Sequence, residues 1–473
     1  MVPNKVIVKA SGMKSKPLET LRGMKTFLVI WAGQLVSIIG SGLTGFALSV
    51  WMFEQTGQAT PLALNALFFN LPRVILSPIA GSIADRYNRR MILILADCGA
   101  ALTTLAVAMI LVSGNLQVWH IYLTTAISSA FSAFQEPAYR ASITMMVPKK
   151  DLARAGGIQQ IGFAIQSILT PLIASVLYLS VGLEGVILID FATFFIAIGA
   201  LLVVRIPQPR ATTETGEEGE KQSMWQDSLF GWRYLRKQPG LFGLLWYYAA
   251  VNFFLSLSGV LMLPLVLSYG AAMDIGVIQM AGGAAMLIGG LVMGVWGGPK
   301  SRLIWGVVAA IALSGFGYFL AGLRPITWVI GAAQFVILFF IPISAALSQA
   351  VWQKKVAPDI QGRVFAIRAM IAYLIIPLAN LVAGPLADNV FEPLLEEGGA
   401  LSGSFVAGLV GVGAGRGIAL IFIVSAISLW VTSVYAFTNP RIRNLEEEIP
   451  DAIPDEPDEV PSVTDEPILQ TSP

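Results

Sequence analysis

Four charged residues lie within long apolar stretches of the sequence, namely Arg73, Asp97, Glu136 and Arg140. A charge in such a stretch is costly without a partner, and by default it marks a pathway for an ion or a polar substrate. At about 1.5 Å per helical residue, Arg73 and Glu136 lie at matching depths of roughly 16 Å. Asp97 and Arg140 match at roughly 10 Å. We therefore expect two ion pairs that could couple a proton to transport, although for Asp97 with Arg140 a structural role is the stronger interpretation.

The composition places the chain in the membrane class. Of its 473 residues 55% are hydrophobic and 12% are charged, and the mean hydropathy is +0.72. A soluble domain carries about 25% charged residues, so this chain has too few charges to keep its apolar residues away from water. The single cysteine and the single histidine, Cys98 and His120, argue against an intrachain disulfide and a metal site rich in either residue. No phosphate-binding loop motif occurs, and we expect no cofactor and no nucleic-acid partner.

Twelve apolar stretches are long enough, at about 20 residues each, to cross a bilayer as helices. They fall near 26–53, 60–83, 91–113, 118–147, 155–180, 184–205, 240–269, 274–297, 303–322, 326–351, 364–389 and 415–437. The sequence therefore predicts an all-α membrane protein of about 12 transmembrane helices. Its expected parts are an N-terminal tail (1–25), a six-helix bundle (26–205), a linker with a possible surface helix (206–239), a second six-helix bundle (240–437) and an acidic, disordered tail (438–473).

The two sets of six stretches read as a two-fold repeat. The loop after the fourth stretch is VPKKDLARAGG and the loop after the tenth is VAPDIQGRVFA. Each loop leaves its helix at a proline and starts the next helix beside an arginine. Two pseudo-symmetric bundles with a site between them are a recurring plan of transporters, and the plan alone names no substrate.

Lysine and arginine set the expected orientation. With the N-terminus in the cytosol, every basic residue except Arg73, Arg140, Arg324 and Arg416 falls in an inside segment or its flank. Positively charged loops stay on the cytosolic side of a membrane. We therefore expect both termini and the 206–239 linker to be cytosolic.

The most specific motif lies between the second and third stretches and reads GSIADRYNRR. Its glycine, its acid four residues later and its basic cluster resemble the signature that the major facilitator superfamily carries in this loop. The resemblance implies an inside latch, in which the acid faces the positive N-terminal end of the eleventh helix. The glycine would let two helices approach closely. The residues implied are Gly81, Asp85, Arg86 and Arg90, with Gly362 and Arg363 at the start of the eleventh helix.

Three further segments narrow the resemblance to one branch, namely FQEPAYRASITMMVP, QAVWQKKVAPDIQGRVFAIR and GPLADNVFEP. They resemble the macrolide-efflux and enterobactin-exporter group of drug/proton antiporters, which implies a transporter and no enzymatic activity. The chain departs from this pattern at Ser41, where many relatives carry an acid. A hydroxyl does not titrate in the relevant range, so Glu136 becomes the best candidate for proton coupling.

Polar residues on the first two helices could line a cavity, although in membrane helices such residues more often hydrogen-bond neighbouring helices. They are Gln34, Ser37, Ser41, Asn65 and Asn70.

We expect a monomeric secondary transporter of the inner membrane, driven by the proton gradient, that exports a small amphipathic compound and has the lipid bilayer as its other partner. A siderophore exporter and a lysophospholipid transporter of the same branch are the alternatives within transport. A membrane-embedded lipid enzyme would need a nucleophile–base pair or metal ligands, and the acids here are isolated and His120 stands alone. A transport-dead sensor of the same fold stays open.

Overall fold

The computed structural model describes residues 24–148, 151–204, 224–299 and 301–452, and within these ranges it contains helices and no strand. The first half consists of α2 (Lys25–Thr56), α3 (Thr60–Arg86), α4 (Arg89–Val112), α5 (Val118–Met146) and α6 (Leu152–Val203). After α7 (Met224–Lys237) come α8 (Pro239–Leu267), α9 (Ala272–Trp296), α10 (Leu303–Leu323), α11 (Thr327–Lys355), α12 (Pro358–Leu386) and α15 (Arg416–Thr438). The short elements are the π-helix η2 (Ala387–Phe391), α13 (Glu392–Leu395), α14 (Phe405–Val410), α16 (Pro440–Arg443) and α17 (Leu445–Glu448).

Glycine and proline set several of these boundaries. Gly57, with φ at +62°, ends α2, and a proline in the first turn starts α3 directly afterwards. Proline suits this position because its missing N–H would have no helical partner there. Gly182, at φ 70° and ψ −177°, interrupts α6, which therefore consists of two helical segments. This confirms the separation predicted between 155–180 and 184–205.

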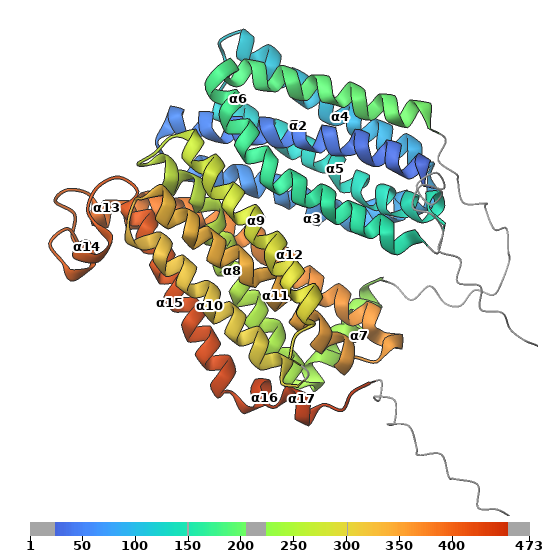
Figure 1. The fold of residues 1–473 in the computed structure, drawn as a ribbon, viewed down its shortest axis with the longest axis vertical. Helices are drawn as coiled ribbons and strands as arrows, with labels where there is room; N and C mark the ends of the chain where they lie inside the picture. Colours follow the sequence, from blue (N-terminus) through green and yellow to red (C-terminus); the bar gives the residue numbers. More distant parts are fainter. Residues whose placement is uncertain (1–23, 149–150, 205–223, 300, 453–473) are drawn as a thin grey trace, which may run out of the picture.

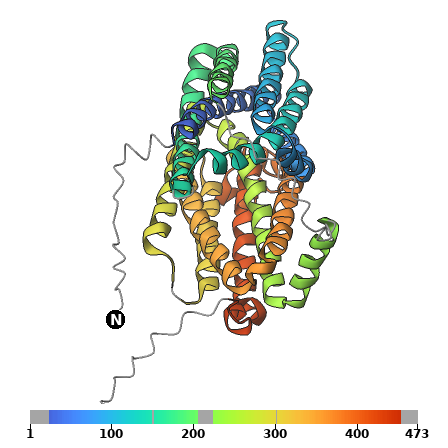
Figure 2. The same cartoon turned by 90° about the vertical axis from the view of Figure 1, so that its right-hand side faces the viewer.

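The long helices form two bundles, which Figure 1 shows as the blue-to-green and the light-green-to-red groups and Figure 2 shows from the side. In the N-terminal bundle α2 packs on α6 and α3 packs on α5. In the C-terminal bundle α10 packs on α11 and α15, and α8 packs on α12 and α15.

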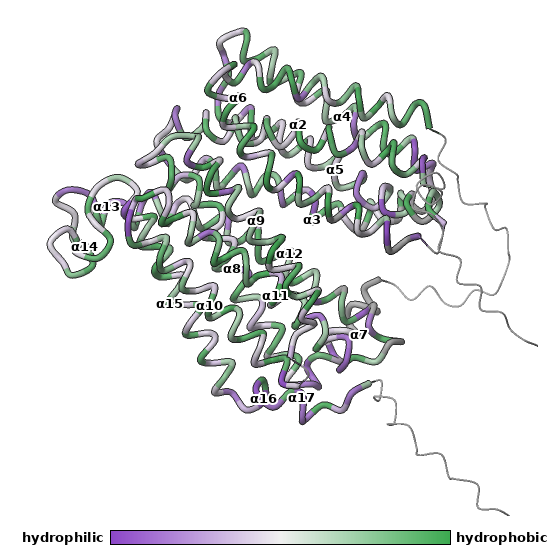
Figure 3. Tube along the Cα trace, in the orientation of Figure 1, coloured by the Kyte–Doolittle hydropathy of each residue, from purple (hydrophilic) through white to green (hydrophobic). Residues whose placement is uncertain are grey.

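Nine helices in the described ranges are long and apolar enough to cross a membrane. Figure 3 shows hydrophobic residues along the long helices and polar residues mainly near their ends and around α7, α16 and α17. Large apolar side chains such as Val203 and Val295 are exposed on the helix surfaces, which suits contact with lipid rather than water.

The two bundles meet at one end and diverge at the other (Figure 1). We call the end at which α7 lies the linker end and the opposite end the far end. At the far end, a Cβ added to Gly384 of α12 would overlap the backbone of Thr60 of α3. A Cβ added to Gly276 of α9 would likewise overlap the side chain of Ser175 of α6. Small residues therefore bring the two bundles into close contact here.

The linker ends of the same helices are not packed in this way. No described atom lies within 4 Å of a Cβ added to Gly81 of α3, or to Gly290 or Gly294 of α9. The close helix approach expected at Gly81 is therefore absent from the described part of this conformation.

The helix expected in the linker is confirmed. α7 contains the aromatic and basic run MWQDSLFGWRYLRK, and it packs against α12. Its Leu235 is fully buried, and a Cβ added to Gly231 would lie 2.8 Å from the Arg363 carbonyl oxygen. The rest of the linker, 205–223, lies outside the described residues, as do 1–23 of the N-terminal tail.

The disorder expected for 438–473 is wrong for its first part. α16 and α17 are helical, and Ile442 and Leu445 are buried against the C-terminal bundle. The buried Lys355 of α11 anchors this segment, because its Nζ donates to the Glu446 carbonyl at 2.6 Å and pairs with Asp451 at 2.7 Å. Acidic composition predicted disorder, whereas a buried cation holds this segment through one carboxylate and backbone carbonyls. Residues 453–473 lie outside the described residues.

Candidate functional site

An exposed ion triad lies in the middle of the N-terminal bundle. Arg73 of α3 donates to Glu136 Oε2 at 2.9 Å, and Arg140 donates to Glu136 Oε1 at 2.7 Å. The three side chains are 37%, 47% and 74% exposed in the order Arg73, Glu136, Arg140. The predicted Arg73–Glu136 pair is confirmed. Because two guanidinium groups share one carboxylate, the triad carries a net positive charge.

Local sequence positions the triad. Arg140 follows Glu136 by four residues, so both side chains lie on the same face of α5. Pro137 lies inside this helix and cannot donate a backbone hydrogen bond, which loosens the helix beside Glu136. The Phe69 ring lies 5.4 Å from the Arg73 guanidinium carbon and supports it from the preceding turn of α3.

Asp97 has different partners from those predicted. Its carboxylate accepts hydrogen bonds from the Gln34 amide at 2.8 Å and from the Gln135 amide at 2.6 Å. Asp97 is 2% exposed, whereas Arg140 is exposed and turned to Glu136. The predicted Asp97–Arg140 pair is therefore wrong, because equal depth does not fix the face of a helix on which a side chain lies.

The buried network and the exposed triad are adjacent in the chain. Gln135 bonds inward to Asp97, and its neighbour Glu136 bonds outward to Arg73. Gln135 also donates to Gln34 at 3.1 Å, which ties α2, α4 and α5 together behind the triad. Sequence analysis missed Gln135, although its place directly before Glu136 was a usable signal.

A second buried carboxylate belongs to Asp190 in the second segment of α6. It accepts from Ser41 at 3.3 Å and from Thr104 at 3.4 Å, and Asp190 is 1% exposed. Ser41, where the resemblance led us to look for an acid, therefore contacts a carboxylate supplied by another helix. No local signal in the sequence connects these two residues, which are 149 positions apart.

The five expected cavity residues differ in where they lie. Gln34 and Ser37 are buried within the N-terminal bundle, so they do not line an open face in this conformation. Asn70 donates to a carbonyl of its own helix at 2.8 Å. Ser41 is exposed, and Asn65 is half-buried with its amide oxygen unpartnered. The Ser41 hydroxyl already donates to Asp190, and the unpartnered Asn65 oxygen is buried, so a cavity-lining role for either residue stays a prediction.

The predicted inside latch falls partly outside the description. The side chains of Asp85 and Arg86 lie outside the described residues. For Gly362, only the helical backbone is described. α12 begins at Pro358, earlier than expected, so Gly362 and Arg363 lie within the helix rather than at its N-terminus. The Pro358 start follows from the preference of proline for the first turn of a helix.

Arg90 caps a helix of its own bundle. Its guanidinium donates to the Leu201 carbonyl at 2.8 Å and to the Leu202 carbonyl at 2.7 Å, at the end of α6. The last carbonyls of a helix lack helical donors and carry partial negative charge, so a cation is stabilising there. Arg90 therefore joins α4 to α6 rather than joining the two bundles, in contrast to the latch role expected for it.

A cavity of about 330 Å³ lies between the bundles, with walls from α6, α9 and α11. Its polar lining residues are Gln166, Ser167, Thr170 and Gln279. The Thr170 hydroxyl is buried and has no hydrogen-bond partner. Mostly apolar cavities of this size with a few polar groups are typical of small-molecule sites.

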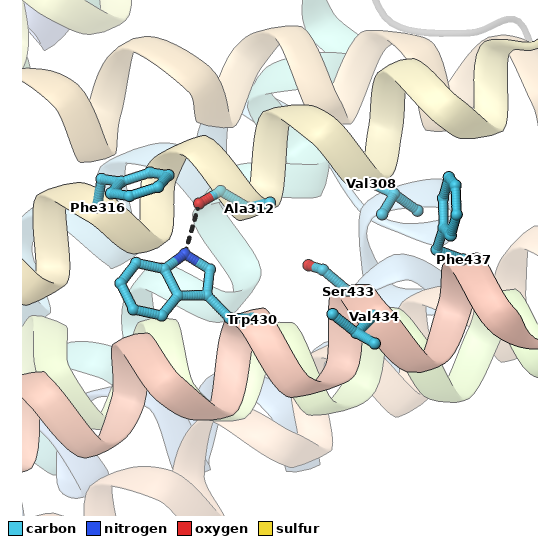
Figure 4. Close-up of a pocket in the computed structure, with 7 residues that line it drawn as sticks. All are labelled: Val308, Ala312, Phe316, Trp430, Ser433, Val434 and Phe437. Carbon is cyan, nitrogen blue, oxygen red and sulfur yellow. Dashed lines mark hydrogen bonds between the residues drawn. The ribbon is translucent and has the colours of Figure 1, made fainter.

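A larger groove of about 430 Å³ lies on the C-terminal bundle between α10 and α15 (Figure 4). Trp430 closes it on one side by donating to the Ala312 carbonyl at 2.9 Å. Its lining is apolar apart from one hydroxyl, and Phe316 and Val434 are exposed at its surface, so it suits contact with lipid. The lining residues are Val308, Ala312, Phe316, Trp430, Ser433, Val434 and Phe437.

The C-terminal bundle contributes an arginine that sequence analysis missed. Arg368 of α12 donates to Gln349 at 2.8 Å and lies 5.4 Å from the Trp352 ring. Arg368 was counted with the basic inside flanks, although it already lies within the apolar stretch 364–389. Like Arg73 of α3, Arg368 lies within a long helix.

Two helical bundles with ionisable groups inside their helices and a cavity between them are an arrangement typical of membrane transporters. In the part of the chain that the structure describes, no cluster of three metal-ligating side chains occurs. The model of the Major Facilitator Superfamily matches residues 30–380, and the chain belongs to this family of transporters. It is a multi-pass membrane protein.

Its relatives include named efflux proteins. The chain is 29% identical over 374 residues to macrolide efflux protein A of Streptococcus pyogenes, which covers 77% of this chain and 90% of that protein. It is 24% identical over 373 residues to the multidrug efflux pump Tap of Mycolicibacterium fortuitum, with 76% and 89% covered. A shorter match, 26% over 195 residues, links it to the enterobactin exporter EntS of Salmonella choleraesuis, with 41% and 47% covered. The predicted resemblance to this group is confirmed.

Solved structures share the fold. A bacterial homolog to the human lysosomal transporter Spinster, in an inward-facing and unoccupied conformation, matches with a TM-score of 0.66 at 16% identity, over 92% of this chain and 99% of that chain. The nucleoside transporter NupG matches with a TM-score of 0.60 at 13% identity, over 88% and 99%. At these identities the likeness concerns the fold alone.

Proposed function

We propose that this protein is a proton-coupled exporter of an amphipathic organic compound that works by alternating access. The observation that carries the proposal is Glu136, an exposed carboxylate in the middle of a helix, held between Arg73 and Arg140. The names of the macrolide and multidrug efflux relatives support the substrate class and the direction of transport.

The exposure of the triad favours a functional role over a stabilising one. Glu136 is 47% exposed, and ion pairs that water can screen contribute little to stability. An ionised Glu136 can accept hydrogen bonds from an amine or hydroxyl of the substrate, and a proton on the same carboxylate removes that charge. Proton and substrate then compete for one group, which exchanges them in opposite directions across the membrane.

We further propose twelve spans, with both termini and the linker end in the cytosol of a monomer in the inner membrane. Of the nine helices in the described part of the chain that are long and apolar enough to cross a membrane, α6 counts as two spans because it is interrupted at Gly182, which gives ten. Adding α3 and α5 gives twelve. α3 and α5 contain 27 and 29 residues. At 1.5 Å per residue they reach about 40 Å, enough to cross a bilayer. The basic loops support the orientation.

Cysteine labelling tests this topology. A cysteine placed at Thr213, in a Cys98→Ser background, should react with a membrane-impermeant maleimide only after the cells are permeabilised. Labelling of intact cells at Thr213 would contradict the orientation. A cysteine at Gln58, in the loop at the far end, is the matched control and should react in intact cells.

Transport in everted vesicles tests the function. With acid inside, vesicles containing the protein should accumulate a macrolide such as erythromycin, and a protonophore should abolish this. Glu136→Gln should abolish uphill accumulation while leaving insertion and expression unchanged. Uphill accumulation by Glu136→Gln with the pH dependence of the wild type would remove Glu136 from the coupling role.

The net positive charge of the triad favours a second candidate function. Two guanidinium groups against one carboxylate can hold an anionic substrate, and the match to the enterobactin exporter EntS points to a siderophore. In the same vesicles, an anionic catecholate should then compete with the macrolide, and Arg140→Gln should weaken that competition more than it weakens macrolide transport.

A further inference from the structure

Helix α3 begins without a cap of its own. Its N-cap residue is Ala59, which offers no side-chain acceptor, and its first turn contains no acidic residue. The first N–H groups of a helix lack helical partners and carry partial positive charge. At the buried junction of two bundles, such groups need an acceptor from elsewhere.

The acceptor comes from the other bundle. Asp388, in η2 directly after α12, accepts from the Ala59 N–H at 2.9 Å with Oδ1 and from the Thr60 N–H at 2.7 Å with Oδ2. One carboxylate thus satisfies two backbone donors that lie 328 or more positions away. Gly384, one turn earlier in α12, allows the backbones to approach closely enough for these bonds.

The bulged backbone beside Asp388 aims its side chain. Pro385 cannot donate a helical hydrogen bond, and the chain changes from α-helix to the π-helix η2 two residues later, at Ala387. π-helical turns are rare and are frequent at functional sites, where they shift the direction of a side chain.

Two other carboxylates cap distant helices, but within a single bundle. Glu392 accepts from backbone N–H groups at the start of α15 at 3.1 and 2.9 Å. Glu446 accepts from those at the start of α10 at 3.0 and 3.3 Å. Asp388 uses the same chemistry across the two bundles, and this difference indicates a role that the other two do not share.

We propose that Asp388 is a gating residue that holds the far end closed and must release α3 each time the far end opens. This inference rests on the alternating access of the proposed function, and it does not depend on the substrate or on the proton. When the bundles separate at the far end, the Ala59 and Thr60 N–H groups exchange Asp388 for water. Asp388 therefore adjusts the balance between the two conformations rather than the stability of either bundle.

Distance measurements between spin labels test this proposal in the full-length protein. Labels at Gln55 of α2 and at Ala271 before α9, both exposed, report the far end in a Cys98→Ser background. No substrate and no gradient are present. Asp388→Ala removes both hydrogen bonds, and we expect it to raise the ratio of long to short distances about tenfold, as for the loss of a helix cap. Asp388→Asn retains one acceptor and should give an intermediate shift.

Glu392→Gln is the matched control, because it weakens a cap of the same kind within one bundle. It should lower the melting temperature without changing the distance distribution. An unchanged distribution in Asp388→Ala would overturn the proposal, and so would an equal broadening by Asp388→Ala and Glu392→Gln. A selective shift in Asp388→Ala supports the gate even if the vesicles show no proton-driven export, in which case only the proposed function fails.

Discussion

The two ends of the α3–α12 pair differ in how the same helices meet. At the far end, Gly384 lets the backbones touch, and Asp388 bonds across the bundles to the start of α3. At the linker end, Gly81 of α3 has no described atom within 4 Å of an added Cβ. One pair of helices is therefore closed at one end and open at the other. The difference supports the proposed alternating access, in which the bundles would rock about the contact between them and seal one end at a time.

The closed end is built so that it can open. Its described contacts include small residues in close approach, apolar residues such as Val50 and Ala63 that cluster with the C-terminal core, and two charge-assisted hydrogen bonds, which contribute about 1.5–3 kcal/mol each. Contacts of this size can shift a two-state equilibrium by tens of times and can be replaced by water when the ends separate.

The largest effects should come from replacing the glycines at the two ends of the α3–α12 pair by larger residues. Gly384→Val would place atoms into the Thr60 backbone, and overpacking of this kind costs about 1–3 kcal/mol. We expect the far end to open and transport to fall at least tenfold. Gly81→Val meets no described atom here and should leave this conformation intact, but it should prevent the linker end from closing.

Both glycine variants should therefore lose transport while accumulating opposite conformations. Protease accessibility at the linker end and spin-label distances at the far end distinguish the two. Gly81→Val with full transport would show that the linker ends of α3 and its neighbours never close tightly, and the comparison of the two ends would fail.

A smaller effect is expected from Arg73→Gln than from Glu136→Gln. After Arg73→Gln, the carboxylate keeps Arg140 at 2.7 Å as a partner, whereas Glu136→Gln leaves two facing guanidinium groups with no carboxylate. We expect uphill efflux to be lost in Glu136→Gln and reduced severalfold in Arg73→Gln, with melting temperatures close to wild type because the triad is exposed. Equal losses in both variants would mean that the ion pair, rather than the carboxylate, is what transport requires.

The smallest effect on transport should follow Asp97→Asn. Its buried carboxylate accepts from two glutamine amides, and losing the charge leaves those donors less well satisfied, at a cost of about 1–3 kcal/mol. The change should appear as a lower melting temperature with efflux per folded molecule near wild type. A normal melting temperature with lost uphill efflux would instead make Asp97 part of the coupling path.

The helices were predictable from the sequence because apolar length and proline or glycine boundaries are local signals. The apolar stretches 155–180 and 184–205 were separated in the sequence, and Gly182 between them is where α6 breaks. The start of α12 was misplaced because its first turn, Pro358 to Gln361, is polar and fell outside the apolar stretch.

The site was predictable where helix depth and helix face agree, and not elsewhere. Arg73 and Glu136 lie at the same depth and on facing sides of their helices, so the pairing predicted from depth is present. Asp97 and Arg140 match in depth alone, and packing turned them to different partners. The Asp388 cap joins residues more than 300 positions apart, and only the folded interface between the bundles brings them together.

The central claim is that the two ends of the α3–α12 pair close in turn, and Asp85→Asn tests it most directly. The resemblance places Asp85 in the latch of the linker end, so its loss should favour the conformation described above, in which that end is open. Spin labels at Met145 of α5 and Gln353 of α11 report the linker end, and labels at Gln55 and Ala271 report the far end. The account predicts that Asp85→Asn increases the population of long distances at the linker end and the population of short distances at the far end. Asp388→Ala should shift both populations in the opposite direction. A shift of both variants in the same direction would contradict it.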